Sequence, residues 1–197
     1  MALDSYDALK TSIALWAFRS QDEEFEATVP DFIRLLETRV NRELRTTFQE
    51  TSAPIALTNS VGDLPTDYLA FRNFSTIGAF PHVLVSSASA GWGDQFAIEG
   101  LKVRLGGLTP SAGVTLDYYA RIPPLSDANQ TNWLLQRAPD IYLYGSLLEA
   151  CIFMQDADPS SLAKWTALYQ KAVADLQSLD HMARYSRASV RASGPTP

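Results

Sequence analysis

The stretch that decides the fold runs from residue 114 to residue 154 and reads VTLDYYARIPPLSDANQTNWLLQRAPDIYLYGSLLEACIFM. It begins as a short apolar run typical of a β-strand, and Pro123-Pro124 ends that strand. Thr131 then caps a turn of helix. After Pro139 the apolar residues follow helical spacing along a broad stripe, which predicts a buried helix. The stretch therefore joins a β region to the central helix of a bundle.

Two more helices are predicted before the β region, and one after the central helix. The first begins at Ser5 or Asp4 as its cap and carries apolar residues at helical spacing. The second begins after Thr28, with Pro30 in its first turn, where a missing N–H costs little. The last begins after Asp158, an acidic residue suited to an N-cap.

Residues 51–122 have the composition of a β region. Gly, Pro, Ser and Thr become frequent there, and the apolar residues come in short runs. The clearest hairpin is QFAIEGLKVRL, residues 95–105. We expect Glu99-Gly100 to form its turn, because Gly100 can adopt a positive φ, and Leu101 to begin the inward-facing side of the second strand.

These elements predict an α+β fold in which about four helices form a bundle with an inserted antiparallel β region and a flexible C-terminal tail. The terminal helices each have an apolar face and must pack together. We therefore place the helical bundle at residues 1–50 and 123–185, the β subdomain at 51–122 and the tail at 186–197. The tail has few residues to bury, so we expect it to be disordered in isolation.

Composition narrows the classes of function. The chain has 197 residues and a net charge of −6, which argues against a protein that mainly grips a nucleic-acid backbone. No apolar run approaches the length of a membrane span, and the N-terminus lacks the pattern of a secretory signal. The single cysteine, Cys151, lies in an apolar pattern typical of a buried thiol and fits a reducing cytoplasm.

The sequence gives no support to a catalytic or metal site. His82 and His181 have no nucleophile or acid in a recognisable motif around them. Gly91-Trp92-Gly93 and Gly106-Gly107 lack the strand–helix context of a phosphate loop and are interpreted as turns. No metal-ligand motif occurs. We therefore expect no enzymatic activity, no cofactor and no metal.

Two groups of residues are candidates for contacts with other proteins. The second helix has a charged face that is either simply solvated or a subunit contact, and its members are Arg34, Glu37, Arg39, Arg42 and Glu43. The tail has no acid after Asp180. It is well suited to becoming ordered on a partner through Arg184, Tyr185, Arg187, Val190 and Arg191.

Several motifs resemble one known family. YYARIPPLSDANQTNWLLQRAPDIYLYGSLLEA is similar to the corresponding stretch of tailed-bacteriophage adaptor proteins, also called head-to-tail connectors or tail tubular proteins of the A type. VPDFIRLLETRVNRELR resembles their second helix, LPTDYLAFRNF the start of their β region, and ARYSRASVR the end of their last helix. Residues 80–96 match least well. The resemblance spans most of the chain.

The resemblance implies a structural virion protein at the head–tail junction, or neck, made in the host cytoplasm. Such adaptors form a homo-oligomeric ring, here expected to be a dodecamer, between the portal protein and the tail or nozzle proteins. The helical body lines a channel through which double-stranded DNA passes without specific binding. The C-terminal segment, here Arg184 to Arg191, docks on the portal.

Two alternatives stay open at the level of the sequence. The first is another head-completion protein or a tail terminator, which would occupy a different layer of the virion. The second is a carboxylate-based hydrolase of cell wall or sugar. The paired acids Glu23-Glu24 lie in a solvent-like connector, whereas catalytic carboxylates usually lie in clefts.

Overall fold

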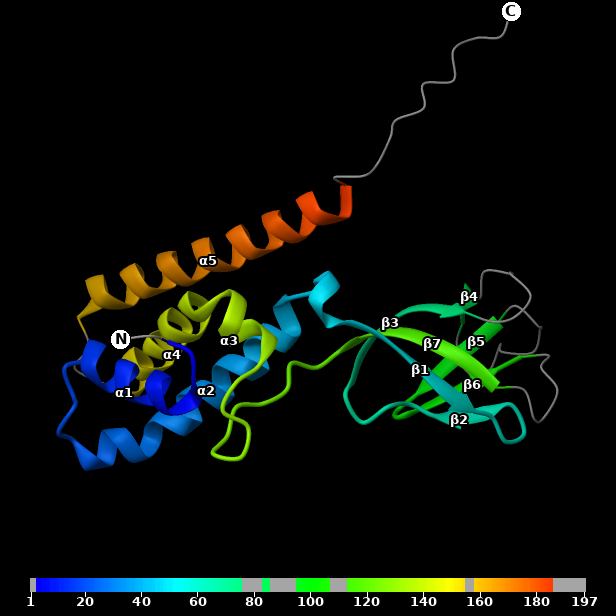
Figure 1. Ribbon diagram of the computed structural model, residues 1–197, viewed down its shortest axis with the longest axis horizontal. Helices are drawn as coiled ribbons and strands as arrows, with labels where there is room; N and C mark the ends of the chain where they lie inside the picture. Colours follow the sequence, from blue (N-terminus) through cyan, green and yellow to red (C-terminus); the bar gives the residue numbers. More distant parts are fainter. Residues whose placement is uncertain (1–2, 76–82, 86–94, 107–112, 155–157, 186–197) are drawn as a thin grey trace, which may run out of the picture. The chain divides into compact units, whose positions relative to one another are not determined.

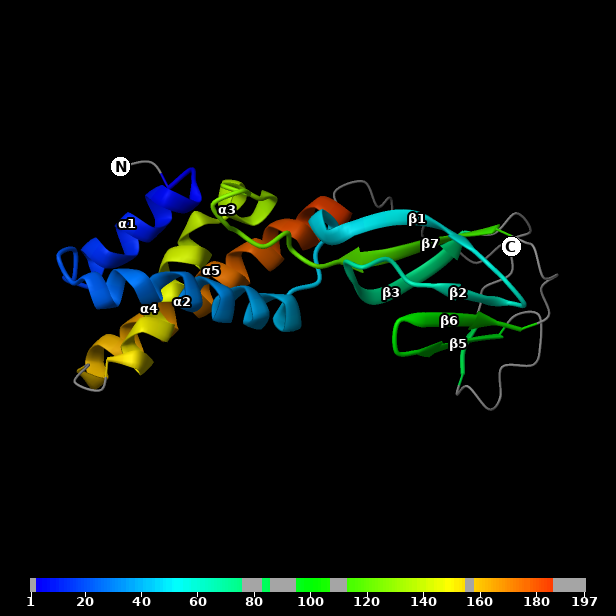
Figure 2. The ribbon, with the colours of Figure 1, turned by 90° about the horizontal axis from the view of Figure 1, so that it is seen from below.

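A computed structural model describes residues 3–75, 83–85, 95–106, 113–154 and 158–185. The chain divides into two compact units, a helical unit made of Met1–Thr47 with Ile122–Pro197 and a β unit made of Phe48–Arg121. Figures 1 and 2 show both. The mixed α+β class predicted from the sequence is confirmed. The expected flexible tail, residues 186–197, lies outside the described residues.

The helical unit is built around its fourth helix. Its helices are α1 (Tyr6–Trp16), α2 (Glu23–Glu43), α3 (Trp133–Arg137), α4 (Pro139–Phe153) and α5 (Pro159–Tyr185). Helix α4 packs against each of the other four (Figure 1), and most of its side chains are buried. It starts at Pro139, whose missing N–H costs nothing in a first turn. The broad apolar stripe therefore predicts its central position correctly.

Helix α2 begins earlier than the sequence pattern predicts. The Asp22 carboxylate accepts a hydrogen bond from the Phe25 N–H at 3.1 Å, so Asp22 and not Thr28 is the N-cap. Pro30 consequently lies inside the helix. Thr28 instead donates its hydroxyl to the Glu24 carbonyl oxygen at 2.8 Å, a bond that a Thr in the body of a helix commonly makes.

The cap of α3 also differs from the prediction. The Asn132 side chain, and not that of Thr131, accepts from the Leu135 N–H at 2.9 Å. Asn132 is buried, whereas Thr131 is exposed. At the start of α1 the predicted cap is correct, because the Ser5 hydroxyl accepts from the Ala8 N–H at 3.3 Å.

The β unit holds two small sheets. Its strands are β1 (Glu50–Ala56), β2 (Val61–Asp63), β3 (Tyr68–Ser75), β4 (Val83–Leu84), β5 (Gln95–Glu99), β6 (Lys102–Leu105) and β7 (Gly113–Ala120), preceded by the 3₁₀ turn η1 (Thr47–Gln49). One sheet has the antiparallel order β1-β7-β3. The other has the order β2-β6-β5-β4, in which β4 pairs with β5 in parallel.

The hairpin of β5 and β6 turns one residue later than expected. Glu99 pairs with Lys102, so the turn residues are Gly100 and Leu101. Gly100 has a φ of +62°, as its prediction as a turn glycine requires. Leu101 is 65% exposed and does not face inward, because it belongs to the turn and not to the strand. Both sheets contribute to one apolar core, which includes Phe74, Phe96, Leu105 and Leu116.

Candidate interaction surfaces

The charged residues of α2 do not form one exposed face. Arg34, Arg42 and Glu43 are exposed, Arg39 is half-buried, and Glu37 is buried with only 6% of its surface exposed. Successive residues of a helix are about 100° apart, so Glu37 lies on the apolar side, between Ile33 and Val40. That spacing was the signal available in the sequence. Glu37 is therefore not available for a contact with another chain.

Glu37 is the centre of a buried hydrogen-bond network. Its Oε1 accepts from the Tyr142 hydroxyl and from the Leu125 N–H, each at 2.9 Å. Asn132 donates its amide Nδ2 to the Tyr142 oxygen at 2.7 Å and to the Pro123 carbonyl oxygen at 2.7 Å. Burial raises the pKa of Glu37, although the hydrogen bonds from Leu125 and Tyr142 oppose this shift. The network ties α2 and α4 to the segment that follows Pro123-Pro124.

Arg39 and Glu43 each have a side-chain partner within the chain. The Arg39 guanidinium pairs with the Glu149 carboxylate, and the Tyr169 hydroxyl donates to Glu43 Oε2 at 2.7 Å. Burial, and then the Glu43 carboxylate, raise the pKa of Tyr169. Arg39, Glu43 and Tyr169 line a groove of about 320 Å³ between α2, α4 and α5, which Leu148 also lines. Both charged residues therefore stabilise helix packing.

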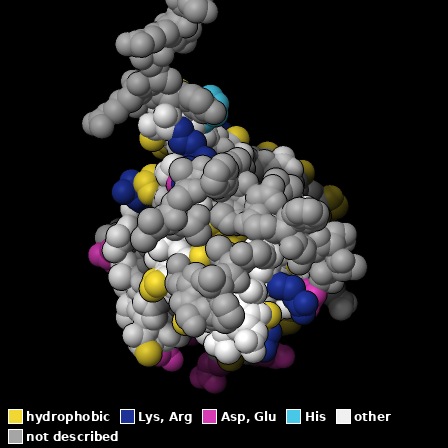
Figure 3. All heavy atoms as spheres, turned by 90° about the vertical axis from the view of Figure 1, so that its right-hand side faces the viewer, with side chains coloured by type: hydrophobic (Ala, Val, Ile, Leu, Met, Phe, Trp, Pro, Cys, Tyr) yellow, Lys and Arg dark blue, Asp and Glu magenta, His cyan; other side chains and the backbone are white. Residues whose placement is uncertain are grey.

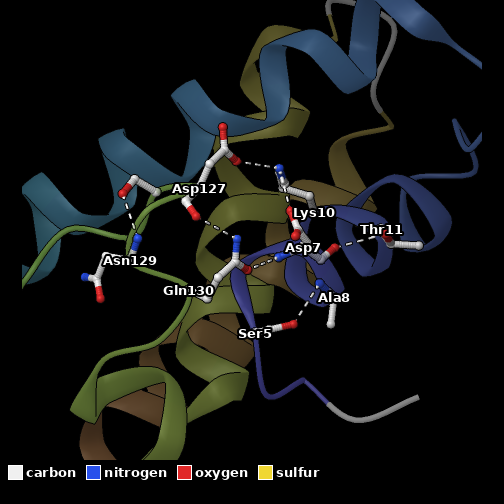
Figure 4. A network of polar contacts seen from close by, with 9 residues as sticks. Ser5, Asp7, Ala8, Lys10, Thr11, Asp127, Asn129 and Gln130 are labelled. Carbon is white, nitrogen blue, oxygen red and sulfur yellow. Dashed lines mark hydrogen bonds and ion pairs between the residues drawn. The ribbon is translucent and has the colours of Figure 1, made fainter.

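The segment after the β unit is also fixed to α1, as Figure 4 shows. The Gln130 carbonyl oxygen accepts from the Tyr6 N–H at 2.7 Å, and its Oε1 accepts from the Asp7 N–H at 3.2 Å. Lys10 lies 3.2 Å from the Asp127 carboxylate and 2.8 Å from that of Asp7. Hydrogen bonds to these carboxylates raise the pKa of Lys10. Asp127 and Gln130, which belong to the family motif quoted above, therefore serve to hold this segment against α1.

The end of α5 carries the first part of the candidate docking segment. Thr47 donates its backbone N–H to Asp180 Oδ1 at 2.7 Å, and Arg184 lies 2.8 Å from Asp180 Oδ2. Burial alone would raise the pKa of Asp180, but these hydrogen bonds hold it below its ordinary value. Leu179 and Met182 are exposed. Of the other candidates, Tyr185 ends the helix, while Arg187, Val190 and Arg191 lie outside the described residues.

The described part of the chain holds no group of three or more His, Cys, Asp or Glu side chains that could bind a metal ion. Cys151 is buried, and burial raises the pKa of its thiol. His181 is exposed on α5, and His82 lies outside the described residues. Among the residues that the structure describes, no helix is long and apolar enough to span a membrane.

Figure 3 shows the charged side chains on one face of the molecule. The Lys and Arg side chains drawn in blue form small separate groups there, and some lie beside Asp or Glu side chains drawn in magenta. A protein that grips nucleic acid usually presents a basic patch or stripe. The coloured part of this face shows no such stripe.

Comparison with known families decides the assignment. The sequence model of the family described as SU10 adaptor protein matches residues 4–193. The chain belongs to the SU10 adaptor protein family. This family comprises head–tail adaptors of bacteriophages, so the resemblance noted in the sequence is confirmed. A search of curated proteins finds no match to the chain.

Membership in the SU10 adaptor family makes the chain a structural adaptor of a phage virion. It implies a place at the head–tail junction and association with portal and tail components. The family is a structural class and not a class of enzymes. The match covers residues of both compact units, including α2, the β strands and α5.

Proposed function

We propose that this SU10 adaptor forms a homo-oligomeric ring, a dodecamer on a twelve-fold portal, that joins the portal protein to the tail and surrounds the DNA channel. The observation that carries the proposal is the family match over residues 4–193. A net charge of −6 supports passage of DNA without adhesion, because like charges repel over about a Debye length, about 8–10 Å.

The portal contact is assigned to the end of α5 and the residues after it. Leu179 and Met182, near the end of α5, are 63% and 64% exposed. The chain from His181 onward contains Arg184, Arg187 and Arg191 and no acid. An apolar and basic segment of this kind suits a partner surface that is apolar with an acidic rim.

Deletion of residues 186–197 tests this assignment. We expect the shortened chain to keep the helix content and the melting temperature of the full chain, because the α5 side chains buried in the helical unit lie before residue 181. We expect it to lose binding to purified portal rings in co-sedimentation. Retention of full portal binding would show that docking uses another surface.

The position in the virion is tested by negative-stain imaging of heads with and without the protein. An adaptor adds a layer directly on the portal, whereas a stopper or a tail terminator adds a layer further from the head. Counting subunits in that layer by symmetry averaging gives the number of copies in the ring.

A further inference from the structure

One end of the helical unit exposes large apolar side chains. At the end of α1 and the turn after it, Leu15, Trp16 and Phe18 are 49%, 45% and 94% exposed, and Phe153 at the end of α4 is 49% exposed. Figures 1 and 2 both place these two helix ends at the same end of the unit. Phe153 lines a groove of about 230 Å³ together with Arg19 and Asp22 of the α1–α2 turn. We call this surface, formed by Leu15, Trp16, Phe18 and Phe153, the aromatic end.

Phe18 occupies a position where the backbone favours glycine. Its φ is +57°, and it follows the C-cap of α1 in a Schellman turn. In that turn Arg19 N–H donates to the Ala14 carbonyl oxygen at 2.9 Å, and Phe18 N–H to that of Leu15 at 3.1 Å. A bulky residue with positive φ is strained. Its almost fully exposed side chain gains too little packing within the described residues to compensate for that strain.

The rim of the aromatic end is acidic. Glu23, Glu24 and Glu26 in the first turn of α2 are all exposed. Arg19 lies 3.6 Å from the Asp22 carboxylate, which offsets its charge. A contiguous apolar surface with a polar rim marks a site of protein contact. The partner must therefore combine apolar side chains with basic ones.

The second half of α2 presents such a surface. Leu35 is 54% exposed, and Arg42, seven residues later, is exposed on the same side of α2. Arg34, which precedes Leu35, is exposed on the adjoining side of the helix. We call these three residues the basic face. Asp31 at its edge is acidic, which leaves the face with a net positive charge. Glu24 and Arg42 are about 27 Å apart along the axis of α2, so these two side chains of one chain cannot pair with each other.

In a ring, neighbouring subunits meet through two different surfaces. We propose that the aromatic end of one copy docks on the basic face of the next copy, with Phe18 packed beside Leu35 and with Glu23 and Glu24 opposite Arg34 and Arg42. This inference rests on the proposed function, because it names the contact that closes the ring.

Charge reversal tests the pairing in full-length chains added to portal rings, with copies per portal counted by native mass spectrometry. Glu23→Lys/Glu24→Lys should weaken assembly about tenfold, and so should Arg34→Glu/Arg42→Glu, because each places like charges in contact. All four substitutions in one chain should restore assembly, since both surfaces then change sign together. Failure of restoration, or normal assembly of either double variant, overturns the pairing.

Phe18→Gly separates the contact from the fold. Glycine relieves the backbone strain and removes a side chain that is 94% exposed, so the variant should melt at the same or a higher temperature than the natural chain. It should nevertheless assemble about tenfold less tightly. A variant that assembles normally overturns the role of Phe18. Leu101→Gly, an exposed apolar residue of the β unit, is the matched control and should assemble normally.

Disulfide trapping distinguishes failure of this inference from failure of the proposed function. The double variant Phe18→Cys/Leu35→Cys, concentrated without portal, should form ladders of linked chains on oxidation. Phe18→Cys alone should stay monomeric, since Cys151 is buried. A ladder together with absent portal binding would retain the contact and refute the portal role. Portal binding without a ladder, or dimers of Phe18→Cys alone, would refute the contact.

Discussion

Glu37 carries a carboxylate into the core of the helical unit, where Tyr142 and Leu125 donate hydrogen bonds to it. A buried charge is costly unless it is well paired. Here the oxygen that accepts both bonds joins three segments that are far apart in sequence. Burying Glu37 therefore costs some stability, but it fixes the position of the segment after Pro123-Pro124.

The first prediction concerns how the stability that Glu37 contributes depends on pH. Because burial raises the pKa of Glu37 above its ordinary value of 4.5, the folded protein holds this proton more tightly than the unfolded chain does. Its contribution to stability is complete below pH 4.5 and is lost as the pH rises through the raised folded pKa. Glu37→Gln keeps the acceptor oxygen and should flatten this fall in urea unfolding measured between pH 4 and 8.

Glu37→Ala is the contrasting variant. It removes the acceptor and leaves the Tyr142 hydroxyl and the Leu125 N–H without it, which should cost about 1–3 kcal/mol. A Gln variant as unstable as the Ala variant would show that the charge itself, and not the acceptor, stabilises the unit.

The second prediction concerns the cap of α3. Asn132→Ala removes the capping hydrogen bond to the Leu135 N–H and the hydrogen bonds to Pro123 and Tyr142. It should lower the free energy of unfolding by about 2–3 kcal/mol. Thr131→Ala changes the neighbouring residue, which is exposed, and should cost less than about 0.5 kcal/mol. Chemical denaturation of both variants decides which residue is the cap. Equal losses would contradict the assignment of Asn132.

At the scale of elements, α2 and α4 approach closely at Gly145. A Cβ added there would lie 2.3 Å from Cδ1 of Leu36, whose side chain is fully buried. The third prediction is that Gly145→Ala destabilises the protein by about 1–2 kcal/mol, because overpacking outweighs the gain in helix propensity.

A size exchange provides the control for this prediction. Leu36→Ala alone leaves a cavity, and adding Gly145→Ala should fill part of it. The double variant should therefore be less destabilised than the sum of the two single variants. Additive losses in thermal melting would show that the two helices do not depend on this contact.

At the scale of the whole molecule, the two units have separate apolar cores. The sheet core that contains Phe96 and Leu116 is made of β-unit residues, whereas α4 lies at the centre of the helical unit. The fourth prediction is that Leu148→Asp, at a side chain 6% exposed, unfolds the helical unit, because an unpaired charge there costs several kcal/mol.

Leu35→Asp makes the same chemical change on the same unit at a side chain that is 54% exposed. It should change the unfolding free energy by less than about 1 kcal/mol. Calorimetry of both variants compares a core position with a surface position. An unchanged melting profile for Leu148→Asp would show that α4 is not the core of the unit.

Local signals in the sequence predict much of this fold. The apolar stripe after Pro139, the turn glycine Gly100 and the cap Ser5 each act within a few residues, so their positions follow from spacing and backbone preference. The family motifs are also local, and they led to the same assignment as the family match over residues 4–193.

The tertiary structure decided what local signals leave open. Thr28 and Thr131 are the predicted caps, whereas Asp22 and Asn132 are the observed ones. Asn132 is held in place by hydrogen bonds from its amide to Pro123 and Tyr142, which no local pattern predicts. The same holds for the charges of α2. Spacing places Glu37 near the apolar side, but only the arrival of Tyr142 and Leu125 from about 90–100 residues away makes it a buried acceptor, because a hydrogen-bond partner is defined by position in space.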